Sequence, residues 1–250
     1  MFLKRAEIID KINHFSGYGE SFLFVIDFAG ENGIVLTPKE ANDKGILYDL
    51  KGSANTVETT AKKPVRFDFS GVNFETYKKV FEKVVFHLKR GDTYLLNLTF
   101  PTLLQTNLSM TEIFAISRAR YKLYVPGYFV VFSPETFVHM QDSRICSCPM
   151  KGTIDASIPN AAVKLLADEK ELFEHNTIVD LIRNDLSMVL TGVKVTRSRF
   201  IERIHTNRGD LLQMSSEICG NLPEDWFKNL GEILFALLPA GSVTGAPKKK

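Results

Sequence analysis

The chain has 250 residues, of which 44% are hydrophobic and 24% charged, a composition typical of a soluble globular protein that can bury a core without disulfide or metal staples. Its formal net charge of +2 gives no reason to expect nucleic acid as a partner. The N-terminal segment is charged throughout, unlike a secretory signal, and the apolar runs are too short to cross a membrane.

The first seventy residues are predicted to form short strands separated by turns. Segments rich in β-branched and aromatic residues alternate there with Gly, Asn, Asp and Lys. A polar segment at 52–64 is predicted to be a loop. The strands are expected at 21–28, 33–37, 46–50 and 65–70.

The middle of the chain is predicted to mix helices and strands. Apolar residues recur at spacings of three and four over 74–88, which predicts an amphipathic helix. A strand is expected at 93–100, and a helix over 109–120 that begins at a Ser/Thr cap. Four further strands are expected at 121–125, 128–133, 136–140 and 143–148.

The C-terminal part is predicted to begin with a long helical region from about residue 160 to 189. Two long strands (193–206 and 210–219) and a helix with one apolar face (227–238) follow. Neighbouring strands joined by short turns, with helices inserted in blocks, predict an α+β fold with a largely antiparallel sheet. No linker divides the chain, so we expect a single domain over 1–250.

The three cysteines give no sign of a structural role. Cys146, Cys148 and Cys219 are odd in number, and only the first two are close together. This spacing fits neither a disulfide framework nor the usual zinc motifs. A reducing cytoplasm is therefore the predicted location.

Glu135 is a candidate general acid. It stands between two apolar strand segments in VVFSPETF (130–137). A carboxyl group held there would be partly desolvated, which raises its pKa toward the range useful for proton donation. The alternative interpretation, a Pro-Glu turn at the surface, stays open.

Lys151 is a candidate nucleophile. It lies in CPMKGTI (148–154), where a turn after a strand is predicted. A lysine held in a mostly apolar site is more often the neutral, nucleophilic amine. Gly152 would let the backbone approach a ligand, and Thr153 can donate from its N–H and its hydroxyl. A solvated lysine in a turn is the alternative.

Glu174 is a candidate metal ligand on the predicted helix ADEKELFEHNTIVDLIRNDLS (167–187). It is eleven residues from Asp185, close to three helical turns, so the two share a face. Magnesium takes few protein carboxylates and relies on substrate oxygens, which suits a Glu that projects into a cavity. The alternative is a surface helix with solvated ion pairs, on which His175 is a packed residue.

Small residues gather in LLPAGSVTGAPKKK (237–250), ahead of Pro247. Proline suits the first turn of a helix, and a Gly/Ser loop that leads into a helix N-terminus can receive a carboxylate. Three lysines at a helix start oppose its dipole unless a longer helix follows. We therefore expect the chain to lack its C-terminal part. The candidate binding residues of this loop are Gly241, Ser242, Gly245 and Ala246.

Five segments, taken in order, resemble those of the chorismate-utilising enzymes, a family that includes anthranilate, aminodeoxychorismate, isochorismate and salicylate synthases. The resemblance runs from about residue 74 to the end, with a divergent strand region at 1–72. It implies the anthranilate synthase component I-like fold, in which large, mostly antiparallel sheets are layered with helices. The segments are GDTYLLNLT (91–99), SPETF (133–137), PMKGT (149–153), EHNTIVDLIRNDLS (174–187) and PAGSVTGAPK (239–248).

The resemblance also implies a reaction. Members with lysine in the Pro-x-x-Gly-Thr segment resemble aminodeoxychorismate synthase, and Lys151 holds that position. In the implied mechanism the Lys151 amine attacks C2 of chorismate while the C4 hydroxyl leaves, with help from Mg²⁺ and an acid. Ammonia then adds at C4 and expels the lysine. A separate glutamine amidotransferase subunit would supply the ammonia, since no such domain fits in this chain, and the product would feed p-aminobenzoate and folate synthesis.

Each candidate residue matches a position with a role in the family. Glu135 matches the general acid beside the leaving hydroxyl, and Glu174 matches a carboxylate that ligates Mg²⁺. Thr153 and the loop 241–246 match positions that hold substrate carboxylates.

The sequence also departs from the family. Gln213 stands where many relatives have His, and it cannot shuttle a proton near neutral pH. Relatives continue past Gly-Ala-Pro-Lys with a further strand and helix set, a substrate-binding Arg and Tyr, and the remaining Mg²⁺ carboxylates. We therefore expect weak metal binding and exposed apolar edges that favour aggregation. Two alternatives stay open: another chorismate enzyme, such as an anthranilate or salicylate synthase, or a catalytically incomplete fragment that acts only as a binding module.

Overall fold

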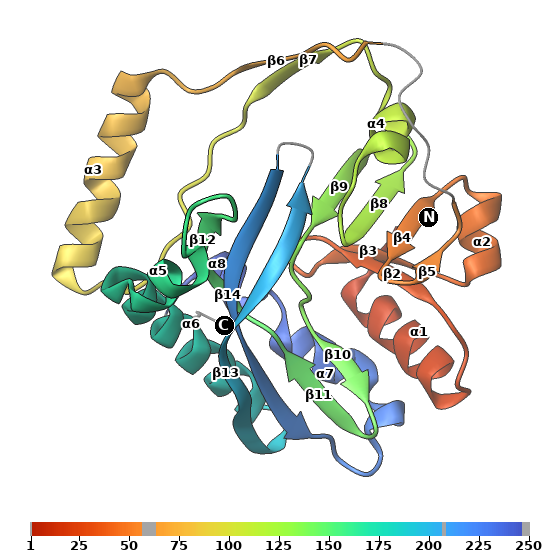
Figure 1. Ribbon diagram of the computed structural model, residues 1–250. Coiled ribbons are helices and arrows are strands. Elements are labelled where there is room, and N and C mark those ends of the chain that lie inside the picture. The colour runs from red at the N-terminus through yellow and green to blue at the C-terminus, as the bar shows by residue number, and fades with distance from the viewer. Residues whose placement is uncertain (1, 57–63, 207–208, 247–250) are drawn as a thin grey trace.

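A computed structural model describes residues 2–56, 64–206 and 209–246 of the chain (Figure 1). Most of the loop expected at 52–64 lies outside these ranges, as do the lysines at the C-terminus. The strand pairs in the described ranges are all antiparallel, and helices cover the sheets, which confirms the α+β prediction. No helix in these ranges is both long and apolar enough to cross a membrane.

The N-terminal region contains helices as well as strands, so the prediction of strands alone is wrong. Ile8, Ile12 and Phe15 follow helical spacing and are buried, while Glu7 accepts a hydrogen bond from the backbone N–H of Lys4 and caps the first turn. These residues define a helix that packs on the sheet β1-β3-β2. The elements are β1 (Leu3–Lys4), α1 (Arg5–Gly17), β2 (Leu23–Ile26), β3 (Asn32–Leu36) and α2 (Pro38–Asp43).

A second sheet has the strand order β5-β4-β8-β9. Its apolar residues face a helix that is capped by Ser109, whose hydroxyl accepts from the N–H of Glu112 as expected. That helix ends at Ile116, four residues before the predicted end. The elements are β4 (Leu47–Leu50), β5 (Ser53–Ala54), α4 (Met110–Ile116), β8 (Tyr121–Val125) and β9 (Phe129–Ser133).

The central sheet is organised around the long strand β14 (Gly209–Asn221). It pairs with β11 (Arg144–Ser147) and β12 (Met150–Asp155) along one edge and with β13 (Thr191–Thr206) along the other. The short strand β10 (His139–Gln141) extends the sheet beyond β11. Figure 1 shows these strands running from the centre to the bottom of the molecule.

Helices cover this sheet. The long helical region predicted for 160–189 is divided at Asp168, whose carboxylate caps the second helix by accepting from the N–H of Glu171. Apolar residues of that helix pack against β11 and β14 to form the largest buried cluster, which contains Ile145, Ile178 and Ile218. The helices are α5 (Ala161–Ala167), α6 (Glu169–Ser187), a 3₁₀ helix (Trp226–Lys228), α7 (Leu230–Leu237) and α8 (Gly241–Thr244). The region formed by β11–β14 and α6 is called the packed region below.

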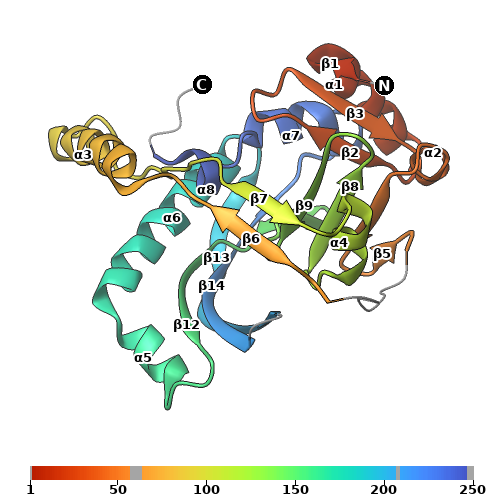
Figure 2. The same ribbon diagram turned by 90° about the horizontal axis from the view of Figure 1, so that it is seen from above.

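The second region, called the arm, consists of β6 (Phe67–Ser70), α3 (Phe74–Arg90) and β7 (Leu103–Thr106). β6 and β7 pair with each other as a two-stranded ribbon, and α3 stands apart from the body in both views (Figures 1 and 2). The helix predicted over 74–88 is confirmed, yet none of the described residues of α3 is buried.

The prediction of a strand at 93–100 is wrong. This segment forms one isolated bridge, between Leu95 and Ala246, and is otherwise irregular. An extended segment becomes a strand only where a neighbouring strand offers a ladder of backbone groups. Here the neighbouring backbone pairs with this segment only at Ala246 within the described residues.

The cysteine prediction is also wrong. Cys146 on β11 and Cys219 on β14 occupy directly opposed positions and form a disulfide across 73 residues of sequence. Cys148 is free. The spacing along the chain could not reveal the pair, because the two strands meet only through the sheet register. The cytoplasmic location stays a prediction and loses the support that it took from the cysteines.

Candidate active site

Glu135 follows the end of β9 and is fixed by a local turn. The Ser133 hydroxyl donates to the Glu135 carbonyl (3.0 Å) and accepts from its backbone N–H (3.1 Å). Burial raises the pKa of the Glu135 carboxyl, although the positive charge of Lys151 and a hydrogen bond with Ser242 oppose the shift. Of the two interpretations of the sequence, the structure favours the partly desolvated carboxyl over the surface turn.

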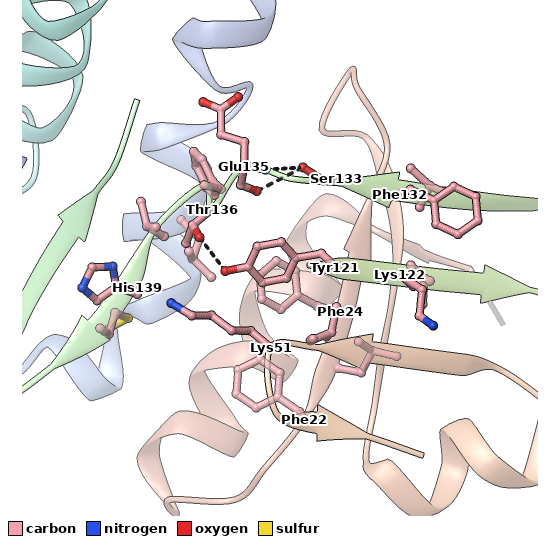
Figure 3. Close-up of a pocket in the computed structure, with 18 of the residues that line it drawn as sticks. Phe22, Phe24, Lys51, Tyr121, Lys122, Phe132, Ser133, Glu135, Thr136 and His139 are labelled. Atoms are coloured by element: carbon pink, nitrogen blue, oxygen red, sulfur yellow. Dashed lines mark hydrogen bonds between the residues drawn. The ribbon is translucent and has the colours of Figure 1, made fainter. Parts of the chain in front are cut away.

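Neighbouring side chains point to opposite sides of this segment. Thr136 hydrogen-bonds to the hydroxyl of Tyr121 (2.5 Å) at an apolar pocket of about 880 Å³ between the N-terminal and second sheets. Figure 3 shows the Glu135 carboxylate pointing away from Tyr121 and Lys51 in that pocket. Glu135 is therefore directed toward the packed region, where Lys151 lies.

Lys151 is part of β12 rather than of a turn, which corrects the prediction. The register between β12 and β14 shifts between Met150 and Thr153, so Lys151 sits in a β-bulge. Its ammonium group lies 3.9 Å from Oε2 of Glu174, and its charge also acts on Glu135. The surroundings expected to be mostly apolar thus contain two carboxylates.

Gly152 packs against the helices of its own chain. Its φ of +80° is a conformation that side chains rarely adopt. A Cβ there would lie 3.0 Å from Cδ1 of Leu165 and 3.2 Å from Oε2 of Glu171. The glycine predicted to admit a ligand therefore lets α5 and α6 approach the strand.

Thr153 and Gln213 are cross-strand partners on β12 and β14. Together they line a second pocket of about 830 Å³, whose wall also contains Arg120 and Ser133. Gln213 can offer this pocket hydrogen bonds but no titrating group. Gln213, which is predicted to lack an acid–base function, thus lines a pocket that also contains Pro134, the residue before Glu135.

Glu174 faces two ammonium groups. Its Oε1 lies 2.9 Å from Nζ of Lys170, and its Oε2 faces Lys151. Lys170 also contacts Oε1 of Glu171 at 3.4 Å, so one ammonium group stands between two carboxylates of α6. Part of the alternative interpretation, a helix with solvated ion pairs, thus holds for the exposed side of α6.

The donor set at Glu174 fits a magnesium ion only in part. Within the described ranges, no group of three or more His, Cys, Asp and Glu side chains could hold a metal. The Lys170 ammonium nevertheless places one positive charge between the carboxylates of Glu171 and Glu174. Carboxylate oxygens are the ligands that Mg²⁺ prefers, and one or two of them suffice when water and substrate supply the rest.

Asp185 and His175, on the same helix, lie elsewhere. Asp185 is buried beneath Gly241, whose added Cβ would lie 2.8 Å from Oδ2 of the carboxylate. His175 is buried and its Nε2 lies 2.6 Å from Oγ of Ser216. The interpretation of His175 as a packed residue is confirmed.

The C-terminal segment is a short helix, α8, rather than a loop, and the helix expected after it lies outside the described residues. Asn97 donates from its side chain to the carbonyls of Ser242 and Val243, each at 2.9 Å. Thr93 donates to the Ala246 carbonyl at 2.7 Å. The segment resembling Gly-Asp-x-Tyr-x-x-Asn-Leu-Thr therefore holds this part of the site in place.

Gly245 allows that contact. Its φ of +94° and its position against the Leu95 carbonyl leave no room for a Cβ. Asn97 and Thr93 were not among the predicted site residues, although their motif was recognised. Their spacing in GDTYLLNLT was the available signal, but it does not reveal a partner about 150 residues away.

The predicted residues thus divide into two groups. The structure brings Glu135, Lys151 and Glu174 together, with Ser242 hydrogen-bonded to the first. The rest lie beside this cluster: Thr153 in the neighbouring pocket, Gly152 against α5 and α6, Gly241 on Asp185, and Gly245 and Ala246 against residues 93–95.

This fold and the ordered motifs define a family. The chain belongs to the chorismate-binding enzymes, whose family model matches residues 31–250. The match begins earlier than the motifs alone indicated, which places most of the divergent N-terminal region inside the family.

The relatives carry several names. The chain is 45% identical over 242 residues to an "Uncharacterized PabA-like protein" of Haemophilus influenzae, covering 97% of this chain and 74% of the relative. It is 30% identical over 195 residues to anthranilate synthase component 1 of Leptospira biflexa, covering 72% and 40%. It is 27% identical over 199 residues to the 2-amino-4-deoxychorismate synthase of Streptomyces globisporus, covering 73% and 39%.

Solved structures support the fold. The structure named "putative 2,3-dihydroxybenzoate-specific isochorismate synthase, DhbC from Bacillus anthracis" aligns with a TM-score of 0.66 and 17% identity over 99% of this chain and 70% of its own. Anthranilate synthase component I of Streptococcus pneumoniae aligns with a TM-score of 0.56 and 25% identity over 76% and 43%. The predicted anthranilate synthase component I-like fold is confirmed.

Proposed function

We propose that the chain is the chorismate-binding subunit of an aminodeoxychorismate synthase, which converts chorismate and ammonia to 4-amino-4-deoxychorismate and water. The observation that carries the proposal is the position of Lys151. Its ammonium group lies 3.9 Å from Oε2 of Glu174, and its positive charge acts on the carboxyl of Glu135. A nucleophile, an acid and a metal ligand are the three groups that the reaction requires.

Glu135 is proposed as the acid that protonates the leaving hydroxyl. The Lys151 amine forms a bond to C2 of the ring, the ring double bonds shift, and the C4–O bond breaks. Glu135 gives its proton to the departing oxygen, which leaves as water. The raised pKa of Glu135 supports this role, because more of the carboxyl keeps its proton toward neutral pH.

In the second half of the reaction, ammonia forms a bond to C4, the double bonds shift back, and the C2–N bond to Lys151 breaks. The lysine is thereby regenerated. Mg²⁺, when bound at Glu174, would hold a substrate carboxylate and offset negative charge on the ring. Thr153 and Gln213 offer hydrogen-bond donors beside the cluster.

Ammonia is proposed to come from a glutamine amidotransferase subunit. The proposal predicts that glutamine replaces ammonium salts only when such a subunit is present. If glutamine alone supports product formation by this chain, the proposed division of labour is wrong.

A second candidate reaction places the amino group at C2. The 2-amino-4-deoxychorismate synthase of Streptomyces globisporus, at 27% identity, is named for that product. Ammonia would then attack C2 directly, whereas in the first candidate the Lys151 amine attacks C2. The two candidates therefore differ in the carbon that carries nitrogen and in the need for the lysine amine.

The test is to incubate the chain with chorismate, an ammonium salt and Mg²⁺ and to determine the product by mass spectrometry and NMR. The proposal predicts nitrogen at C4 and loss of this product in Lys151→Met. Lys164→Met, at an exposed site on α5, is the matched control. Nitrogen at C2, formed equally well by Lys151→Met, would support the second candidate. Chorismate binding without turnover would support a binding module instead.

A further inference from the structure

Lys170 occupies the place where a divalent cation would meet Glu174. Its Nζ lies 2.9 Å from Oε1 of Glu174, four residues further along α6, and 3.4 Å from Oε1 of Glu171. Lys151 faces the other Glu174 oxygen at 3.9 Å. Both oxygens of the proposed metal ligand are thus turned toward ammonium groups.

The two lysines differ in how easily their side chains can move away from Glu174. The Lys170 side chain is 74% exposed, whereas that of Lys151 is 29% exposed and extends from β12, whose backbone pairs with β14. Exposed ion pairs are weak and are screened by salt. Lys170 can therefore swing into solvent at little cost.

The Glu171 carboxylate is held more firmly than the lysine. Glu171 packs over Gly152, where its Oε2 would lie 3.2 Å from an added Cβ, and its side chain is 25% exposed. Glu174 lies one helical turn further along the same face. A cation at this position would thus find the Glu171 carboxylate already in place and the Glu174 carboxylate beside it, with Lys170 as the side chain that moves.

We propose that Lys170 is a built-in competitor for the divalent cation, and that cation binding displaces its ammonium group from Glu174 and Glu171. The proposal rests on the proposed function in one respect, the assignment of Glu174 as a cation ligand. Competition arises because the ammonium blocks one oxygen of each carboxylate and adds a positive charge next to the incoming ion. Lys170 would thereby set the cation concentration at which the site fills.

The test measures Mn²⁺ binding to the full chain by the decrease of the free Mn²⁺ signal in electron paramagnetic resonance, without substrate. Lys170→Gln should lower the dissociation constant about two- to fivefold, the size expected for loss of one exposed ion pair. Lys170→Arg keeps the charge and should stay near the wild type. Lys164→Gln, an exposed lysine on α5, should also leave the constant unchanged.

Glu174→Gln separates the two proposals. If Glu174→Gln weakens Mn²⁺ binding while Lys170→Gln leaves it unchanged or weaker, the competition is wrong and the metal site stands. If Glu174→Gln leaves the binding of the wild type unchanged, Glu174 is not the ligand and both proposals fail at this point. Absence of Mn²⁺ binding to the wild type and to Lys170→Gln alike would also overturn both.

Discussion

The packed region and the arm each contain a long regular helix, and the two helices differ in how much of their apolar surface is buried. α6 buries His175, Ile178 and Leu181 against the central sheet, so its apolar residues have partners. α3 has the more regular amphipathic pattern, yet Phe74 and Phe81 remain exposed in the structure. Periodicity therefore predicts that a helix forms and which face is apolar, but not what that face contacts.

The site belongs to the packed side of this comparison. Lys151 is on β12 and Glu174 on α6, while Glu135 lies where β9 leads into the central sheet. The distances among these groups depend on the burial of the cluster around Ile178 and Ile218. We therefore expect activity and stability to respond to changes in the packed region and to be nearly indifferent to changes in the arm.

The largest effect is expected for Glu135→Gln. Removal of a general acid typically lowers kcat by about 10²–10⁴-fold. Since the protonated carboxyl is the active form, wild-type kcat should fall as pH rises through the raised pKa of Glu135. Glu135→Gln should lack this decline, and the arm variant Phe81→Ala should keep the wild-type profile. A Glu135→Gln enzyme with wild-type kcat would refute the assignment.

Core packing should give the next largest effect. Ile218 is fully buried on β14, and Ile218→Ala should lower the free energy of unfolding by about 2–5 kcal/mol through lost burial and a cavity. Phe81→Ala, at an exposed position, should change it by no more than about 0.5 kcal/mol. Urea denaturation followed by fluorescence compares the two. Equal losses would mean that α3 is packed in solution.

The cysteines should react according to their burial and pairing. Burial raises the pKa of the Cys148 thiol to about 11, from the ordinary 9.0. At pH 8 its alkylation should therefore be on the order of 100-fold slower than that of a free thiol. Unfolding without reductant should expose one reactive thiol per chain, and unfolding with reductant all three. Three thiols without reductant would exclude the Cys146–Cys219 bond.

The smallest effect is expected for self-association through the arm. Phe69 and Leu104 are cross-strand neighbours on the exposed ribbon, and such apolar strands favour contact between chains. The double variant Phe69→Ser, Leu104→Ser should reduce association several-fold in sedimentation velocity, with little change in stability. A wild-type chain that remains a monodisperse monomer would contradict this expectation.

The sequence predicts the features that depend on interactions between residues close together in the chain. The caps at Ser109 and Asp168 and the amphipathic spacing of α3 are contained within one helical turn or a few. Ile8, Ile12 and Phe15 carry the same spacing in α1, but the strand-like composition of the residues that follow predicts strands for the whole region.

The site was predicted residue by residue but not as an arrangement. Glu135, Lys151 and Glu174 each belong to a recognisable motif, and only the sheet register and the packing of α6 bring them together. The same holds for Cys146 and Cys219, which meet through strand pairing. Contacts between distant segments depend on tertiary structure, which the spacing of residues in one sequence does not encode directly.

The proposed reaction requires a covalent bond between Lys151 and the substrate, and this bond can be detected directly. The chain is incubated with chorismate and Mg²⁺ in the absence of ammonia, and is then examined by intact mass spectrometry and peptide mapping. The covalent mechanism predicts an added mass equal to chorismate minus water, located on Lys151. The adduct should be retained in Lys164→Met and absent in Lys151→Met. No adduct at all, or an adduct on another residue, would contradict it.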